Sequence, residues 1–269
     1  MNLLEELKEL KKVFFSWLVV WILLSFFFFG FGFQRTKLFG QSFYYPLPSL
    51  HSISAYFFEI AKKDLLPNGV QLITLNPLNA FLALTIISIL LALIVSFPFF
   101  LYKLIRYISP ALYQKEKKAI FKVLIPSSFL FIVGCLFAYF LIIPLTFNVL
   151  YSFAITIEVE PFFDITQFVS LVLTLMIVVG IIFLLPVFMS LLTRFGIVDG
   201  QFWRKNWKYA IFIFLVFSAI ITPDGTGITM MLLSAPLAGL YFLGIILTGS
   251  KSKFKNQTVE VNKKLKINQ

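Results

Sequence analysis

An unbroken run of uncharged, mostly apolar residues extends from Val13 to Phe33. At about 1.5 Å per residue, an α-helix of this length crosses the roughly 30 Å hydrocarbon core of a bilayer. Similar runs follow, and the chain is 59% hydrophobic and only 13% charged, against about 45–50% and about 25% in a soluble domain. Because helices satisfy their own backbone hydrogen bonds in lipid, the sequence predicts an all-α integral membrane protein.

Six transmembrane helices are predicted. The five after the first are expected at Asn79–Tyr102, Val123–Tyr151, Ile165–Leu192, Tyr209–Thr222 and Gly225–Leu247. The fifth run gives only about 21 Å of helix, so the last two runs form either two crossings or a re-entrant hairpin. We favour two crossings, because re-entrant segments need a protein-lined cavity. Four prolines are expected to kink the helices into a curved wall with an open concave face: Pro98, Pro126, Pro144 and Pro236.

Three segments flank or interrupt the membrane domain of residues 13–248. In residues 1–12, leucines recur every three positions among charged neighbours, which predicts a short cytoplasmic amphipathic helix at the membrane surface, leading into the first span. In the loop 34–75, a helix is predicted with one apolar face on the bilayer or on the span tops: Ile53, Tyr56, Phe57 and Ile60. The tail 249–269 has six Lys, one Glu and no hydrophobic periodicity, so it is expected to be disordered.

The basic residues report the orientation of the chain. Of its 23 Lys and Arg, 19 fall on one side of the predicted spans and four fall in the first external loop. The positive-inside rule therefore places both termini in the cytoplasm. The net charge of +11 does not indicate nucleic-acid binding, because the cations lie between hydrophobic spans and form no basic face with interleaved aromatics.

The sequence offers little for catalysis. A single cysteine, Cys135, excludes an intramolecular disulfide, and a single histidine, His51, cannot build a metal site without partners. The predicted spans contain no charged residue of the kind that serves as a catalytic group or proton relay. No Gly-rich phosphate loop is present. We expect no catalytic residue, no metal and no cofactor, and the protein is not expected to be an enzyme.

Polar and charged residues are concentrated in the segment between two predicted spans, from Tyr107 to Lys118. Here one carboxylate, Glu116, stands among three lysines and follows a proline-stiffened turn. It is either a counter-ion to those lysines or a ligand group, since a fixed carboxylate accepts a guanidinium bidentately. Glu9 has the same two readings, because its spacing from Lys12 also suits an ion pair on a solvated helix face.

Several short motifs follow one another along the chain in a fixed order that matches a known family. They are Leu66-Pro67-Asn68-Gly69-Val70 with Asn76-Pro77, Ser96-Phe97-Pro98, Ile108-Ser109-Pro110-Ala111-Leu112-Tyr113 with Lys115-Glu116-Lys117-Lys118, Phe137-Ala138-Tyr139-Phe140 with Pro144-Leu145, and Thr222-Pro223-Asp224 with Ala235-Pro236. Over nearly the whole chain this pattern resembles the TatC family, the multispanning receptor subunits of the twin-arginine protein translocase.

The resemblance implies a receptor and scaffold in the cell membrane that binds Arg-Arg signal peptides of folded proteins for export driven by the protonmotive force. Its expected partners are small single-span subunits of the TatA and TatB type and other copies of itself. The implied signal-peptide residues are Glu9, Leu10, Lys11, Tyr107, Pro110, Leu112, Tyr113 and Glu116. Structural or partner contacts are expected at Pro98, Tyr139, Pro144, Asp164 and Asp224.

The chain departs from the family pattern at some positions. Lys11 stands where an arginine is expected and lacks its planar fork. Leu184 precedes the Leu185-Pro186 pair where a polar residue is common, which puts a polar partner contact there in doubt. A small-solute secondary transporter is the alternative, although the inverted repeat or intramembrane charge that would favour it is not found. A lipid-modifying enzyme would need a polar catalytic cluster, which only the Glu116 loop approaches.

Overall fold

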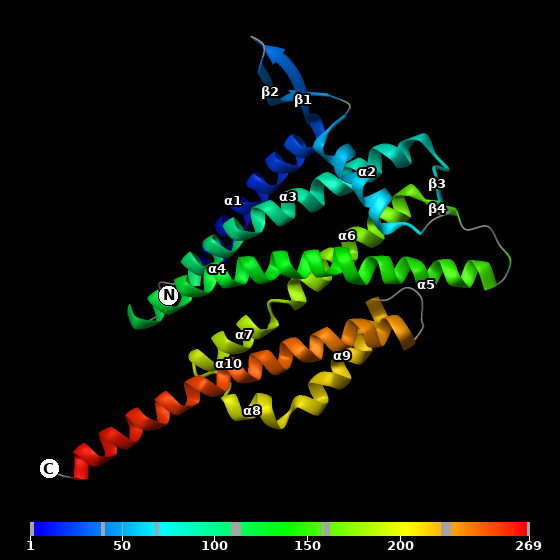
Figure 1. Cartoon of the computed structure of the whole chain (residues 1–269). Helices are drawn as coiled ribbons and strands as arrows, with labels where there is room; N and C mark the ends of the chain where they lie inside the picture. The colour runs from blue at the N-terminus through cyan, green and yellow to red at the C-terminus, as the bar shows by residue number, and fades with distance from the viewer. Residues whose placement is uncertain are drawn as a thin grey trace. The chain divides into compact units, whose positions relative to one another are not determined.

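The computed structural model describes residues 3–38, 41–49, 51–67, 70–108, 114–156, 158, 162–221 and 227–267. It divides into two compact units, Met1–Val178 and Val179–Gln269. The first contains α1 (Leu3–Gly30), β1 (Phe31–Leu38), β2 (Gln41–Pro48), α2 (Ile53–Leu65), β3 (Gln71–Ile73), α3 (Pro77–Ile108), α4 (Gln114–Phe137), the π-helix η2 (Ala138–Ile142), α5 (Ile143–Thr156), β4 (Phe162–Asp164) and most of α6 (Ile165–Ile182) (Figure 1). The second contains the end of α6, then α7 (Leu185–Arg194), α8 (Gly200–Lys205), α9 (Trp207–Ile221) and α10 (Gly227–Ile267).

The helices confirm the predicted class of all-α membrane protein. In the described part of the chain, five helical stretches are long and apolar enough to cross a bilayer: Lys8–Gly30, Pro77–Tyr107, Val123–Thr156, Ile165–Arg194 and Thr229–Thr248. Trp207–Ile220 is a shorter apolar helix at the position of the fifth predicted span. The full crossing predicted for this helix and the cytoplasmic location predicted for both termini remain predictions.

Helices α1 and α3 pack side by side in the first unit (Figure 1). The indole of Trp17 donates to Ser96 Oγ at 3.2 Å, and the indole of Trp21 donates to the carbonyl of Ile89 at 3.1 Å. As the residue number rises along α1, the number of its partner on α3 falls, so the two helices are antiparallel. The start of α1 therefore lies beside the end of α3.

Helix α2 confirms the helix predicted in the first loop, and it packs on the spans through a different face from the apolar one identified in the sequence. Tyr56 is 68% exposed, whereas Ser54, Ala61 and Leu65 are buried. Ser54 Oγ lies 2.9 Å from the carbonyl oxygen of Phe28 and 2.6 Å from Ser88 Oγ. Small residues let helix backbones approach closely and hydroxyls then bond across the interface, which fixes the face that α2 turns to α1 and α3.

A two-stranded hairpin that the sequence did not predict follows α1. Strands β1 and β2 pair antiparallel from Phe31↔Pro48 to Leu38↔Gln41, so the first helix ends at Gly30 and not at Phe33. At its base, a Cβ on Gly32 would collide with the carbonyl oxygen of His51. Only glycine allows this close backbone approach.

Two sites show how the membrane helices accommodate proline, which has no backbone N–H to donate. Pro144 follows the π-helix η2, whose wider turn relieves the clash that a proline ring makes with the carbonyl four residues earlier. Pro186 stands in the first turn of α7, after a break in the fourth span at Phe183 and Leu184, a position where its missing N–H needs no helical partner. Pro98, Pro126 and Pro236 lie inside α3, α4 and α10, which continue through them. The curved wall stays a prediction.

The long helices α1 and α10 extend past the apolar runs toward both ends of the chain. Residues 3–12 belong to α1 without a break before the first span, because no helix-breaking residue separates the leucine-rich segment from the apolar run. Helix α10 extends to Ile267, into the tail of residues 249–269, and the disorder expected for this tail stays a prediction. Extending an existing helix adds a hydrogen bond per residue without the unfavourable nucleation step, and lysine is a good helix former.

In the second unit, close packing joins α7 to α10. A Cβ on Gly244 would lie 2.5 Å from Sδ of the buried Met189. Tyr241 donates to the carbonyl of Trp203 at 2.8 Å, and the Trp203 indole donates to Thr193 Oγ1 at 3.0 Å. These bonds connect α10 through α8 to the end of α7.

Candidate functional site

A polar pocket of about 480 Å³ lies between the start of α1 and the end of α3. Its lining comprises Glu9, Lys12, Val13, Ser16, Lys103, Arg106 and Tyr107. The four residues from α1 are spaced i, i+3, i+4 and i+7, and the three from α3 are spaced i, i+3 and i+4. Such spacings put side chains on one face of a helix, and the antiparallel packing brings the two faces together.

The charges in this pocket are unequal. Among the lining residues that the structure describes, three cationic side chains face one carboxylate, that of Glu9. Glu9, Lys12 and Arg106 are exposed, whereas Lys103 is half-buried, with its Nζ 5.2 Å from the centre of the Phe99 ring. The lining also offers the phenol of Tyr107 and the hydroxyl of Ser16. The pocket can therefore hold anionic groups on several donors and one cationic group on a carboxylate beside an aromatic ring.

The structure brings together two of the residues that the sequence proposed as a site, Glu9 and Tyr107. Leu10 and Lys11 are exposed on α1 and do not line the pocket. Pro110, Leu112 and Tyr113 lie outside the described residues. Glu116 is the third residue of α4, but its side chain lies outside the described part of the chain. The pairing of Glu9 with Glu116 is thus not tested.

Four polar lining residues were missed by the sequence reasoning: Lys12, Ser16, Lys103 and Arg106. The signal for two of them was present, because Lys12 and Ser16 follow Glu9 at helical spacing. Lys103 and Arg106 entered only the charge count. Their role depends on the antiparallel register of α1 and α3, which the sequence does not specify.

Tyr139 and Asp164 make structural contacts in the first unit. The Tyr139 hydroxyl donates to Asp64 Oδ2 at 3.1 Å and so links the third span to the end of α2. Asp164 ends strand β4, which pairs in parallel with β3, and its Oδ2 accepts from Asn79 Nδ2 at 3.0 Å. Asp224 lies outside the described residues.

The Asp164 carboxylate also caps a helix. Its Oδ1 accepts from the backbone N–H of Thr166 at 2.8 Å and of Gln167 at 3.3 Å, at the start of α6. Desolvation raises the pKa of Asp164, but hydrogen bonds from the Asn79 side chain and from backbone amides outweigh it and hold the pKa below its usual value. The carboxylate is thus stabilised in its charged form, as expected for an N-cap.

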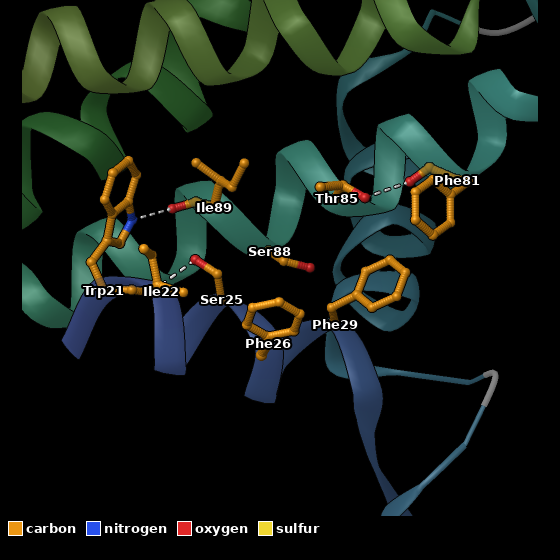
Figure 2. Close-up of a pocket in the computed structure, with 9 residues that line it drawn as sticks. All are labelled: Trp21, Ile22, Ser25, Phe26, Phe29, Phe81, Thr85, Ser88 and Ile89. Atoms are coloured by element: carbon orange, nitrogen blue, oxygen red, sulfur yellow. Dashed lines mark hydrogen bonds between the residues drawn. The ribbon is translucent and has the colours of Figure 1, made fainter. Parts of the chain in front are cut away.

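A second pocket, of about 370 Å³, lies farther along α1 and α3. Figure 2 shows Phe26 and Phe29 from α1 facing Phe81 and Thr85 from α3. Its hydroxyls are already bonded: Thr85 donates to the carbonyl of Phe81, Ser25 to that of Trp21, and Ser88 Oγ bonds Ser54. This pocket therefore presents an apolar surface at membrane depth and has no titratable group.

Metal binding finds no support in the described ranges. Within them, no group of three or more His, Cys, Asp or Glu could hold an ion. Cys135 is buried, and its Sγ lies 3.5 Å from the carbonyl oxygen of Met176.

Comparison with known proteins gives one consistent result. A family model described as Sec-independent protein translocase protein (TatC) matches residues 5–236. The Sec-independent protein translocase protein TatC of Cenarchaeum symbiosum is 35% identical over 242 residues, covering 90% of this chain and 92% of that protein. The TatC of Aquifex aeolicus is 36% identical over 207 residues, covering 74% and 85%. A crystal structure of a twin-arginine translocase receptor, TatC, superposes with a TM-score of 0.73 at 30% identity, covering 92% of this chain and 99% of that one.

Proposed function

Because the chain belongs to the TatC family of Sec-independent protein translocase proteins, we infer that this multipass membrane protein is the subunit that receives signal peptides with paired arginines at its cytoplasmic face. The membrane helices and the family support a translocase component. Recognition of the arginine pair is the finer step, and the polar pocket of α1 and α3 supports it.

The observation that carries the proposal is the joint position of Glu9 and Tyr107 in that pocket. A guanidinium binds a carboxylate through two parallel hydrogen bonds and stacks on an aromatic face. Glu9 supplies the carboxylate and Tyr107 the ring, each from a different helix. In the predicted orientation both lie at the cytoplasmic ends of their spans, where a signal peptide arrives before export.

The second arginine requires a second carboxylate, for which Glu116 is our candidate. It stands in the first turn of α4, a helix that packs against α3. We assign flanking contacts with the peptide to Leu10, Lys11, Pro110, Leu112 and Tyr113. Two separate acids explain why the ligand needs two arginines.

The wider assembly follows from the same proposal. The subunit acts with small single-span partners of the TatA and TatB type and with other copies of itself, and export is driven by the protonmotive force. Leu184, at the break before α7, gives an apolar surface where a polar contact to a partner is common in the family, so the partner interface differs at that point.

The test is direct binding of a synthetic signal peptide to the full chain in a bilayer. A peptide with Arg-Arg is expected to bind more tightly than the same peptide with Lys-Lys, because an ammonium cannot form the two parallel bonds of a guanidinium. Equal binding of the two peptides would contradict the proposal.

A further inference from the structure

The polar pocket of α1 and α3 is too positive for the ligand that we assign to it. Among the described lining residues, Lys12, Lys103 and Arg106 face one carboxylate, and within the described part of the chain no ion pair joins these three cations to an acid. An arriving arginine pair would add two further positive charges. Like charges brought together at a site oppose binding, so an anion must balance the cations if the peptide is to bind.

The geometry points to the headgroup of an anionic membrane phospholipid, bound by Lys12, Lys103 and Arg106 beside Glu9. This inference rests on the proposed function only where it concerns the peptide. The lipid site itself depends on the residues of the pocket and on its depth in the membrane.

The position of the pocket relative to the bilayer favours a lipid as its ligand. The pocket lies where two apolar stretches, Lys8–Gly30 and Pro77–Tyr107, end on the same side. Residues at the end of a span lie at the level of the phospholipid headgroups, and basic pockets between transmembrane helices bind anionic headgroups there. Phosphates are thus present at this level at a concentration that no soluble anion reaches.

The surface next to the pocket also suits acyl chains. Phe14 and Phe15 lie between the pocket residues Val13 and Ser16 on α1 and are 51% and 63% exposed. On the adjoining face, the Trp17 ring lies 4.7 Å from that of Phe100 and its indole is bonded to Ser96. The acyl chains of a lipid bound by the cations can therefore contact exposed apolar side chains of α1, which a free phosphate ion cannot use.

The donors match a phosphodiester. Arg106 can bind two phosphate oxygens at once, while Lys12 and Lys103 contribute point charges and Ser16 one hydroxyl. Each Lys or Arg near a membrane surface strengthens the attraction to anionic lipid by about fivefold. Once the three cations are neutralised, the carboxylate of Glu9 can bind a guanidinium beside the Tyr107 ring. Anionic lipid and an arginine-pair peptide should then bind together better than either does alone.

The lipid site is tested by native mass spectrometry of the purified full chain with equal amounts of phosphatidylglycerol and phosphatidylcholine. The unchanged protein should retain phosphatidylglycerol preferentially. The double variant Lys103→Gln/Arg106→Gln should lose roughly 25-fold of that preference. The matched control, Arg204→Gln/Lys205→Gln, removes two cations from the last turn of α8 and should keep it. Equal retention by both double variants overturns the lipid site, as does displacement of the lipid by inorganic phosphate at the same concentration.

Coupling to the peptide is tested in nanodiscs of either lipid, with binding to empty nanodiscs subtracted. The Arg-Arg peptide should bind the unchanged protein more tightly in phosphatidylglycerol than in phosphatidylcholine. In Lys103→Gln/Arg106→Gln this dependence should disappear, and binding in phosphatidylcholine should become tighter because the repulsion is gone. If the peptide binds equally in both lipids, the coupling is wrong but the receptor function stands. If the peptide binds in neither lipid, the receptor function is wrong and the lipid site is decided by mass spectrometry alone.

Discussion

Glu9 and Tyr107 line one pocket, although one stands near the start of the chain and the other at the end of the second span. The antiparallel packing of α1 on α3 causes this meeting, because it places the start of the first helix beside the end of the second. The same packing adds Lys12, Lys103 and Arg106 and makes the pocket more basic than either helix suggests by itself.

The hydroxyl pair that joins α2 to α3 should contribute measurably to stability. Ser88→Ala removes the 2.6 Å contact with Ser54 Oγ, and interhelical hydrogen bonds in membrane proteins are worth about 0.6 kcal/mol on average and at most about 1.7 kcal/mol. We expect a loss in that range in reversible unfolding in detergent. Thr85→Ala is the matched control, because the Thr85 hydroxyl donates to Phe81 in its own helix. An equal loss in both variants would show that the pair contributes nothing specific.

Close packing of α7 on α10 should make Gly244 intolerant of a side chain. In Gly244→Ala the new Cβ meets Sδ of Met189 at 2.5 Å and Cα of Pro186 at 3.3 Å, so the helices must shift. Overpacking of this kind is destabilising by about 1–3 kcal/mol. Gly239→Ala lies on the same helix with nothing within 4 Å and should be neutral or slightly stabilising. A Gly244→Ala protein as stable as Gly239→Ala would contradict this packing.

The Asp164 cap should make stability depend on pH at the acid end. Its pKa is lowered in the folded chain, so the stabilisation is present above the unfolded value of about 3.9 and is lost as the pH falls through the lowered folded value. Asp164→Asn should have a lower Tm than the unchanged protein at neutral pH, by a few degrees. The two proteins should converge in acid. A difference in Tm that stays constant down to the lowest pH would contradict the role of the charged carboxylate.

The orientation of the chain is open to a labelling experiment. With the native Cys135 replaced by alanine, a cysteine at Ser42 should react with a membrane-impermeant reagent added from outside, and one at Ser252 should not. The expectation follows from the asymmetry of 19 cations against four. The reverse pattern of labelling would overturn the predicted topology.

The positions of the membrane spans could be predicted from the sequence, but the contacts between the spans could not. The first span could be found because an apolar run such as Val13–Phe33 has one stable state in lipid, a helix. Its end was misplaced by three residues because the change to β1 at Phe31 depends on pairing with Pro48, a long-range contact that no periodicity encodes. The buried face of α2 was missed for a related reason: Ser54 is buried by hydrogen bonds, and hydrophobicity gives no sign of them.

Only part of the candidate site was accessible from the sequence. Glu9 and Tyr107 followed from the family resemblance, and their position in one pocket agrees with a shared role. Lys103 and Arg106 were not anticipated there, because a charge at the end of a span usually reports only topology. Their role depends on which residues of α1 lie opposite, and that register is set by the indole bonds of Trp17 and Trp21.

The central claim is that Glu9 and Glu116 each bind one arginine of a signal peptide. The decisive measurement is the Kd of an Arg-Arg peptide, with its Lys-Lys counterpart as reference, for the full chain in nanodiscs. Glu9→Gln and Glu116→Gln should each weaken Arg-Arg binding by roughly 5- to 150-fold, because one guanidinium loses its partner in a partly desolvated site. The control Glu59→Gln, at an exposed position on α2, should bind like the unchanged protein. If Glu116→Gln binds the Arg-Arg peptide as tightly as the unchanged protein and still distinguishes it from Lys-Lys, the paired-carboxylate site is wrong.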